Sequence, residues 1–156
     1  MQLALKVPGS AFRDLRTIIT YTGYDENKAT ELALELAFSL YRLAVHYGVS
    51  EVTIPLAQKR GYVYRVPLFP RPKRRDEEDT ENRSPLRVNI SANAHGCLKA
   101  ISKHYNLSDE VTLWLSLQLV AEMLHGMDRA KSHSYVVQLK DGRRLRGDIE
   151  TPPKLT

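Results

Sequence analysis

The side chains most often used in catalysis are present in this sequence, but their spacing matches no catalytic or metal-binding pattern. The five histidines lack the spacing of metal ligands; they are His46, His95, His104, His125 and His133. The single cysteine, Cys97, stands among apolar residues, where a thiol usually serves as a small core side chain. No glycine-rich phosphate loop is present. We therefore expect no enzyme, no cofactor and no metal.

The composition is typical of a folded, basic protein of a reducing compartment. The 156 residues are 42% apolar and 26% charged, which provides for a hydrophobic core in one domain or two small ones. The net charge of +5 favours a polyanionic partner. A single cysteine excludes an internal disulfide, and the sequence contains neither a membrane-spanning apolar run nor a signal-peptide profile. A cytoplasmic protein without membrane attachment is expected.

A charged segment divides the chain. Residues 70–84 contain no apolar residue other than proline, and the basic block 73–75 is followed directly by the acidic block 76–79. Such a segment cannot bury enough surface to offset its ordering entropy, and the abutting opposite charges favour a solvated linker over a nuclear-localisation or nucleic-acid tag. The sequence thus predicts units at 1–69 and 85–156, joined by a linker at 70–84.

The two units align with each other without gaps at an offset of 83 residues. Leu15 then meets Leu98, Ile18 meets Ile101, and the turns also coincide. Identities alone are near the level of chance, but the coincidence of core-type positions throughout favours an internal duplication.

Each unit contains the pattern of a short strand followed by two helices. Apolar residues alternate with polar ones over residues 2–7 and 85–90, as in a strand with one buried face. A first helix follows, capped by Ser10 or Asn93 and ending near residue 22 or 105. The second helix is capped by Asp25 or Ser108 and ends near residue 47 or 130.

Each unit ends with a hairpin pattern. Residues 52–56 and 62–66 flank one turn, and residues 135–139 and 143–149 flank the other turn, at Asp141–Gly142. The order strand, helix, helix, hairpin therefore occurs twice, and the predicted fold class is α+β.

A strand followed by two helices, the second longer, resembles the ribbon-helix-helix family of MetJ/Arc-type DNA-binding proteins. The resemblance covers residues 3–47 and 86–124 and leaves out the hairpins and the linker. It implies a dimer in which two strands pair antiparallel and enter the major groove. With two copies in one chain, the strands pair either within the chain, as a pseudo-dimer, or between chains, so self-association is expected.

The resemblance also implies base contacts from the strand faces opposite the core. Arginine and lysine suit guanine, whereas asparagine and glutamine suit adenine. The implied base contacts are Gln2, Ala4, Lys6, Arg87, Asn89 and Ser91. The alternative is that these are ordinary solvent-facing residues.

Phosphate contacts are harder to assign. The family holds phosphates at the start of its second helix, but here both starts are acidic, leaving Asn27 and Ser108 as candidate donors. Positive charge is available in the hairpins. The candidate phosphate contacts there are Lys59, Arg60, Arg65, Lys140, Arg143, Arg144 and Arg146.

The predicted function is sequence-specific binding of double-stranded DNA, as a small transcriptional repressor or a plasmid or phage regulator. The alternative is a protein–protein interaction module (an anti-repressor, adaptor or inhibitor) on the same scaffold. Trp114, which stands where the first unit has Glu31, would then contact the partner or lie in the core. RNA binding through the basic hairpins is a third hypothesis.

Overall fold

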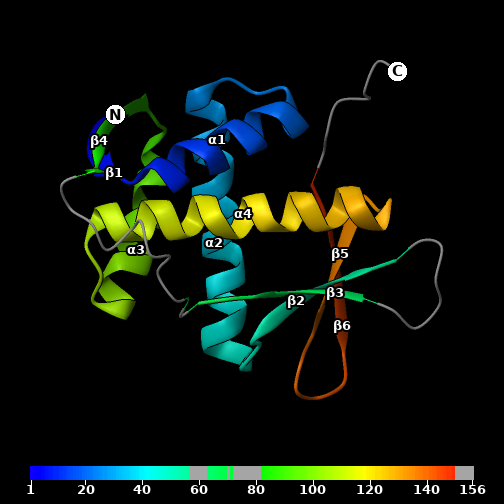
Figure 1. Cartoon of the computed structure of the whole chain (residues 1–156). Coiled ribbons are helices and arrows are strands. Elements are labelled where there is room, and N and C mark those ends of the chain that lie inside the picture. Colours follow the sequence, from blue (N-terminus) through cyan, green and yellow to red (C-terminus); the bar gives the residue numbers. More distant parts are fainter. Residues whose placement is uncertain (57–62, 70, 72–81, 150–156) are drawn as a thin grey trace.

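The computed structural model describes residues 1–56, 63–69, 71 and 82–149. The described residues form an α+β fold with four helices and two antiparallel sheets (Figure 1). The elements are β1 (Gln2–Val7), α1 (Gly9–Thr22), α2 (Glu26–Tyr47), β2 (Glu51–Pro55), β3 (Val63–Pro67), β4 (Ser84–Asn89), α3 (Ala92–Tyr105), α4 (Asp109–Ala130), β5 (Ser134–Gln138) and β6 (Arg144–Asp148). Strand, helix, helix and hairpin thus follow one another twice, as predicted.

The helix caps explain most of the element boundaries. The Asp25 carboxylate accepts the Lys28 N–H at the start of α2, and the Ser108 hydroxyl accepts the Val111 N–H at the start of α4, as predicted. The two shorter helices begin two residues earlier than expected, after Pro8 and Ser91. The Ser91 hydroxyl caps α3 by accepting the Ala94 N–H, whereas Pro8 at the start of α1 makes no side-chain cap hydrogen bond. The main-chain N–H of Ser91 also contacts Glu31 of α2, as described below.

The helix ends correspond between the two halves. α1 ends at Gly23 and α3 at Asn106, while α2 ends at Gly48 and α4 at Lys131, all with positive φ. Glycine adopts this conformation without strain, whereas Lys131 carries a Cβ that disfavours it. The corresponding helices of the two halves therefore end in the same left-handed conformation, whether the residue there is glycine or not.

β1 and β4 form a two-stranded antiparallel ribbon within one chain. The register places Gln2 opposite Asn89, Ala4 opposite Arg87 and Lys6 opposite Pro85. The sequence left intrachain and interchain pairing open, and the structure has the intrachain arrangement. The strands that were the reason to expect self-association therefore have their partner in the same polypeptide.

The two hairpins join into a single four-stranded sheet in the order β3-β2-β5-β6. The junction is the pairing of Thr53 with Val136, where the Thr53 hydroxyl donates to the Val136 carbonyl at 3.2 Å. The sequence predicted both hairpins but gave no sign of this junction, because neither hairpin pattern contains information about its neighbour.

A pseudo-two-fold axis relates the two halves. Thr53 and Val136 are equivalent positions, 83 residues apart, and so are Ala4 and Arg87. Each sheet therefore pairs one residue with its own counterpart, as at the centre of an isologous dimer interface. The helices follow the same rule: α1 packs mainly on α4, and α3 mainly on α2. The units 1–69 and 85–156 consequently share one hydrophobic core.

Both described ends of the 70–84 segment are anchored on α4. The buried guanidinium of Arg71 pairs with Glu122 and donates to the Pro67 carbonyl at 2.9 Å. At the other end, the Arg83 guanidinium lies 4.6 Å from the centre of the Trp114 ring. The prediction of a solvated linker is thus wrong at Arg71 and Arg83, since both arginines pack against α4. Residues 72–81 lie outside the described part of the chain.

Trp114 is a core residue. Its side chain is 0% exposed and lies on α4, where every residue from Val111 to Ala121 is buried. The proposed role of Trp114 as a surface contact for a protein partner is therefore wrong, because its side chain is fully buried. Figure 1 shows α4 crossing the middle of the molecule, from the ribbon to the four-stranded sheet. None of the described helices combines the length and apolar character needed to cross a bilayer.

Candidate nucleic-acid interface

The β1–β4 ribbon has one buried and one exposed face. Leu3, Val7, Leu86 and Val88 point into the core, because side chains alternate along a strand. The residues between them are exposed, and they include five of the predicted base contacts. These are Gln2, Ala4, Lys6, Arg87 and Asn89. The ribbon thus brings these five residues onto one open surface.

The exposed side chains form closely spaced cross-strand pairs. Met1 and Ile90 exchange both main-chain hydrogen bonds, each at 2.8 Å. In an antiparallel ladder the next pair along is then non-hydrogen-bonded, and such pairs hold their Cα atoms closest together. Gln2–Asn89, Ala4–Arg87 and Lys6–Pro85 are therefore the close pairs. Except in Pro85, which has none, the main-chain N–H groups of these residues point outward to the edges of the ribbon.

Side chains from the second helix of each half bind these edges. The Asn89 N–H donates to Asn27 Oδ1 at 2.9 Å, and the Lys6 N–H donates to Glu110 Oε1 at 3.4 Å. The two bonds are equivalent under the pseudo-two-fold axis, so α2 flanks the β4 edge and α4 flanks the β1 edge. These two N–H groups are therefore occupied and not available to pair with a further strand.

A third edge contact occurs in one half only. The Ser91 N–H donates to Glu31 Oε1 at 2.7 Å. The equivalent of Ser91 is Pro8, which has no N–H, and the equivalent of Glu31 is Trp114, which has no acceptor in its side chain. The corresponding positions of the other half therefore cannot form this bond.

Three predicted contacts have structural roles at helix starts. Ser91 lies beyond β4, and its hydroxyl accepts the Ala94 N–H as the cap of α3. The Ser108 hydroxyl caps α4 in the same way, and the Asn27 amide oxygen holds the ribbon edge. All three residues are exposed, but their oxygen atoms are already engaged within the protein. Sequence reasoning missed Glu110, although its position 83 residues after Asn27 marks it as the counterpart.

Carboxylates flank the cationic ribbon face. Lys6 and Arg87 are its basic residues, while Asp25 and Glu110 lie in the helix starts beside the two edges. The neighbouring Asp109 forms an ion pair with Lys99 of α3. Acidic residues stabilise a helix N-terminus but repel phosphate. The arrangement thus favours hydrogen-bonded base contacts over strong phosphate binding.

The basic hairpin residues do not lie beside the ribbon. Glu110 is next to the ribbon and Arg129 is next to β3, so α4 separates the two sheets by about 30 Å. Figure 1 shows the sheets at opposite ends of the molecule. The predicted phosphate contacts of the described hairpin residues therefore lie at the opposite end of α4 from the ribbon, and Lys59 and Arg60 lie outside the described residues.

Most of these hairpin cations have partners within their own sheet. Arg65 pairs with Glu51 at 3.1 Å, and Arg143 pairs with Asp141 at 2.6 Å. The Arg143 main-chain N–H, together with its guanidinium, holds the pKa of Asp141 below its ordinary value. Arg146 lies 4.0 Å from Asp148, and the Lys140 side chain lies against Gly48 at the end of α2, where a cation is favourable. Arg144 is exposed on β6.

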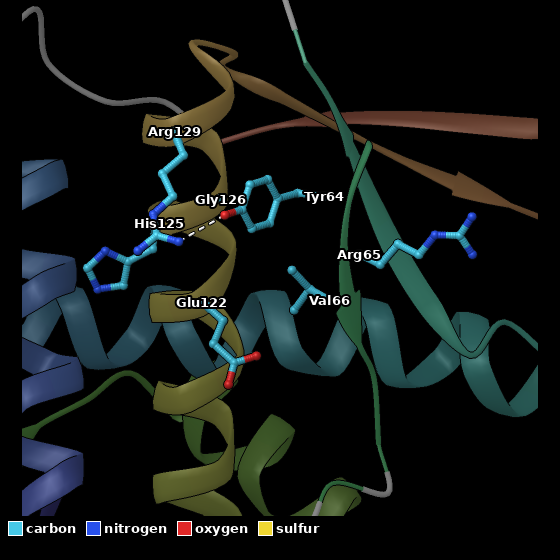
Figure 2. A pocket seen from close by; sticks show the side chains of 7 residues that line it. All are labelled: Tyr64, Arg65, Val66, Glu122, His125, Gly126 and Arg129. Carbon is cyan, nitrogen blue, oxygen red and sulfur yellow. Dashed lines mark hydrogen bonds between the residues drawn. The ribbon is translucent and has the colours of Figure 1, made fainter. Parts of the chain in front are cut away.

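A shallow hollow of about 280 Å³ lies between α4 and β3. Figure 2 shows Arg129 donating to the Tyr64 hydroxyl, a bond of 2.9 Å, while the Arg65 side chain points away to the other side of β3. Glu122 is paired with Arg71, and the ring of His125 stands edge-on to Tyr21. The charged side chains that line the hollow already have partners within the protein, since Arg129 donates to Tyr64 and Glu122 pairs with Arg71. Among the described residues, no group of three or more potential ligands could hold a metal ion.

Comparison of the chain with protein-family models, with curated proteins and with solved structures gives no match.

Proposed function

We propose that this protein binds double-stranded DNA by inserting the face of the β1–β4 ribbon into the major groove, as a tandem ribbon-helix-helix protein. The supporting observation is the ribbon itself, whose five exposed side chains form close pairs above a buried face. A two-stranded ribbon fits the width of the major groove, where each base pair has a distinct pattern of donors and acceptors. A role as a small repressor or as a plasmid or phage regulator follows from the family resemblance.

The side chains of the face suit base edges better than phosphates. Arg87 can donate two hydrogen bonds to guanine, and Gln2 or Asn89 can pair with adenine through one donor and one acceptor. The carboxylates beside both edges weaken general attraction to the DNA backbone. We therefore expect modest affinity with marked sequence preference rather than tight binding to any duplex.

A fluorescence anisotropy titration tests the proposal. The full chain is titrated against a pool of random duplexes at two salt concentrations, and the bound fraction is sequenced. The double variant Arg87→Ala/Asn89→Ala is expected to lose sequence preference. The single variant Arg144→Ala removes an exposed arginine from the far sheet and serves as the matched control, with preference unchanged. Absence of binding by the unaltered chain at low salt would overturn the proposal.

A protein–protein interaction module is the second candidate. The carboxylates of Asp25 and Glu110 beside the ribbon favour it, since they suit a basic protein surface better than a polyanion. A pull-down after nuclease treatment distinguishes this candidate from DNA binding. Recovery of one defined protein by the unaltered chain, but not by the Arg87→Ala/Asn89→Ala variant, would support it.

A further inference from the structure

The face of the ribbon differs between its two ends, although its backbone is symmetric. At one end Gln2 lies opposite Asn89, so both side chains are amides. At the other end Lys6 lies opposite Pro85, so one side chain is a cation and the other has no polar group. Arg87 occupies the centre, opposite Ala4.

The backbone at both ends is held alike. The Asn89 N–H bonds to Asn27 and the Lys6 N–H bonds to Glu110, and the axis through Ala4 and Arg87 exchanges these two contacts. Both ends therefore approach a bound duplex in the same way. Any difference in what they recognise must come from the side chains.

We propose that the ribbon reads a non-palindromic DNA site with adenine at the Gln2–Asn89 end, and guanine at the centre and at the Lys6 end. The inference rests on the proposed function and adds the identity and direction of the bases. An amide side chain pairs with N6 and N7 of adenine, while arginine and lysine donate to O6 and N7 of guanine. Pro85 has no side-chain donor or acceptor, so beside Lys6 it can add only an apolar contact, such as one with a thymine methyl.

The centre of the ribbon supports the same assignment. In a two-fold symmetric dimer the central pair would be two identical residues, and two arginines placed there would repel each other. Here the single Arg87 faces the small Ala4, so its guanidinium has room to turn toward one strand of the duplex. A single central arginine selects guanine on one DNA strand and thereby gives the site a direction.

The experiment selects binding sites from random duplexes with the full chain and with a symmetrised variant. Lys6→Asn combined with Pro85→Gln creates a Gln–Asn pair at both ends of the ribbon. The unaltered chain is expected to select one directional site, with about a tenfold loss of affinity when the guanine at the Lys6 end is replaced. The symmetrised variant is expected to select adenine at both outer positions, on either side of a centre where Arg87 still selects guanine on one strand.

A single variant tests the same inference in case the double variant fails to fold. Lys6→Gln changes only an exposed side chain and should shift the preference at its own end from guanine to adenine, leaving the other end unchanged. Circular dichroism and the thermal midpoint confirm that each variant is folded. A palindromic site for the unaltered chain, or an unchanged site for folded variants, overturns the inference but leaves DNA binding intact. No selection of any duplex at low salt overturns the proposed function itself.

Discussion

Ala4 lies directly opposite Arg87 at the centre of the β1–β4 ribbon, and the two residues are equivalent positions of the two halves. In a symmetric dimer this central pair would consist of two alanines or two arginines. The chain instead combines one of each, which a homodimer cannot do. Joining the two halves covalently therefore permits a central pair in which one long cation has space and no like-charged neighbour.

Introducing a second central arginine should destabilise the ribbon. In the Ala4→Arg variant two guanidinium groups would face each other in a close, non-hydrogen-bonded pair. Like charges placed directly opposite cost roughly 0.2–1 kcal/mol, and salt screens this repulsion. We expect a lower urea midpoint than for Ala4→Gln, a long uncharged control, at low salt only. Equal midpoints for the two variants at low salt would show that the side chains at this pair do not approach each other.

Removing the carboxylate beside the β1 edge should strengthen DNA binding. Glu110→Gln retains the oxygen that accepts the Lys6 N–H but eliminates the negative charge. We expect affinity to rise about two- to fivefold at low salt, with a smaller gain at high salt. Asp148→Asn removes a carboxylate from the distant β6 and provides the control in the same anisotropy titration. A gain of equal size for both variants would indicate a general charge effect rather than proximity to the ribbon.

Trp114 should report on the folded core. It is the only tryptophan, and its side chain is fully buried. The emission of the native protein should therefore be blue-shifted and poorly quenched by iodide, and both properties should change on unfolding. Replacing this side chain by alanine leaves a cavity, so Trp114→Ala should lower the free energy of unfolding by about 3–5 kcal/mol. Red-shifted, readily quenched emission from the folded chain would contradict the burial of this ring.

The Cys97 thiol should be unreactive in the folded protein. Burial, with a smaller contribution from the Glu35 carboxylate, raises its pKa above the ordinary value. Less thiolate is then present at pH 8, so reaction with a disulfide reagent should be much slower than in denaturant.

Because the folded state retains the Cys97 proton more strongly than the unfolded state does, the thiol also adds a pH-dependent term to stability. Its contribution is complete below the unfolded pKa of about 8.5 and is lost as the pH rises toward the folded value. Chemical denaturation of the unaltered chain and of Cys97→Ala from pH 7 to pH 10 checks this sign. A stability difference that grows with pH in favour of the unaltered chain would contradict it.

The intrachain ribbon should make stability independent of protein concentration. An obligate dimer gains stability as its concentration rises, because association is coupled to folding. Here the strand partner belongs to the same polypeptide, so the thermal midpoint should stay constant over a hundredfold dilution. A midpoint that falls steadily on dilution would mean that contacts between chains support the fold.

The sequence was sufficient to predict the elements that depend on local patterns. Alternation located β1 and β4, and capping residues such as Asp25 and Ser108 located the starts of the long helices. The same alternation identified which strand residues would be exposed. The 83-residue offset also predicted that the two halves would have the same order of elements.

Contacts between distant segments could not be predicted in the same way. The pairing of Thr53 with Val136, the Arg71–Glu122 ion pair and the packing of Arg83 over Trp114 join residues far apart in sequence. The positive charge of the hairpins suggested that their arginines bind phosphates beside the ribbon. Charge alone could not show that the length of α4 separates the hairpins from the ribbon. The exposed and buried faces of strands and helices could therefore be predicted, because they follow from the periodicity of the sequence. The residues that contact one another across the fold could not, because they depend on tertiary packing.

The exchange of helix partners between the halves has a consequence for synthesis of the chain. α1 needs α4, and β1 needs β4, so the first half leaves the ribosome before its partners exist. At about 5–20 residues per second, the second half follows only after several seconds. During that interval the leucines of α2 lack the cover that α3 later provides. The first half should accordingly complete its folding only after α3 and α4 have been synthesised, and until then it is a natural client for chaperones that shield apolar helices.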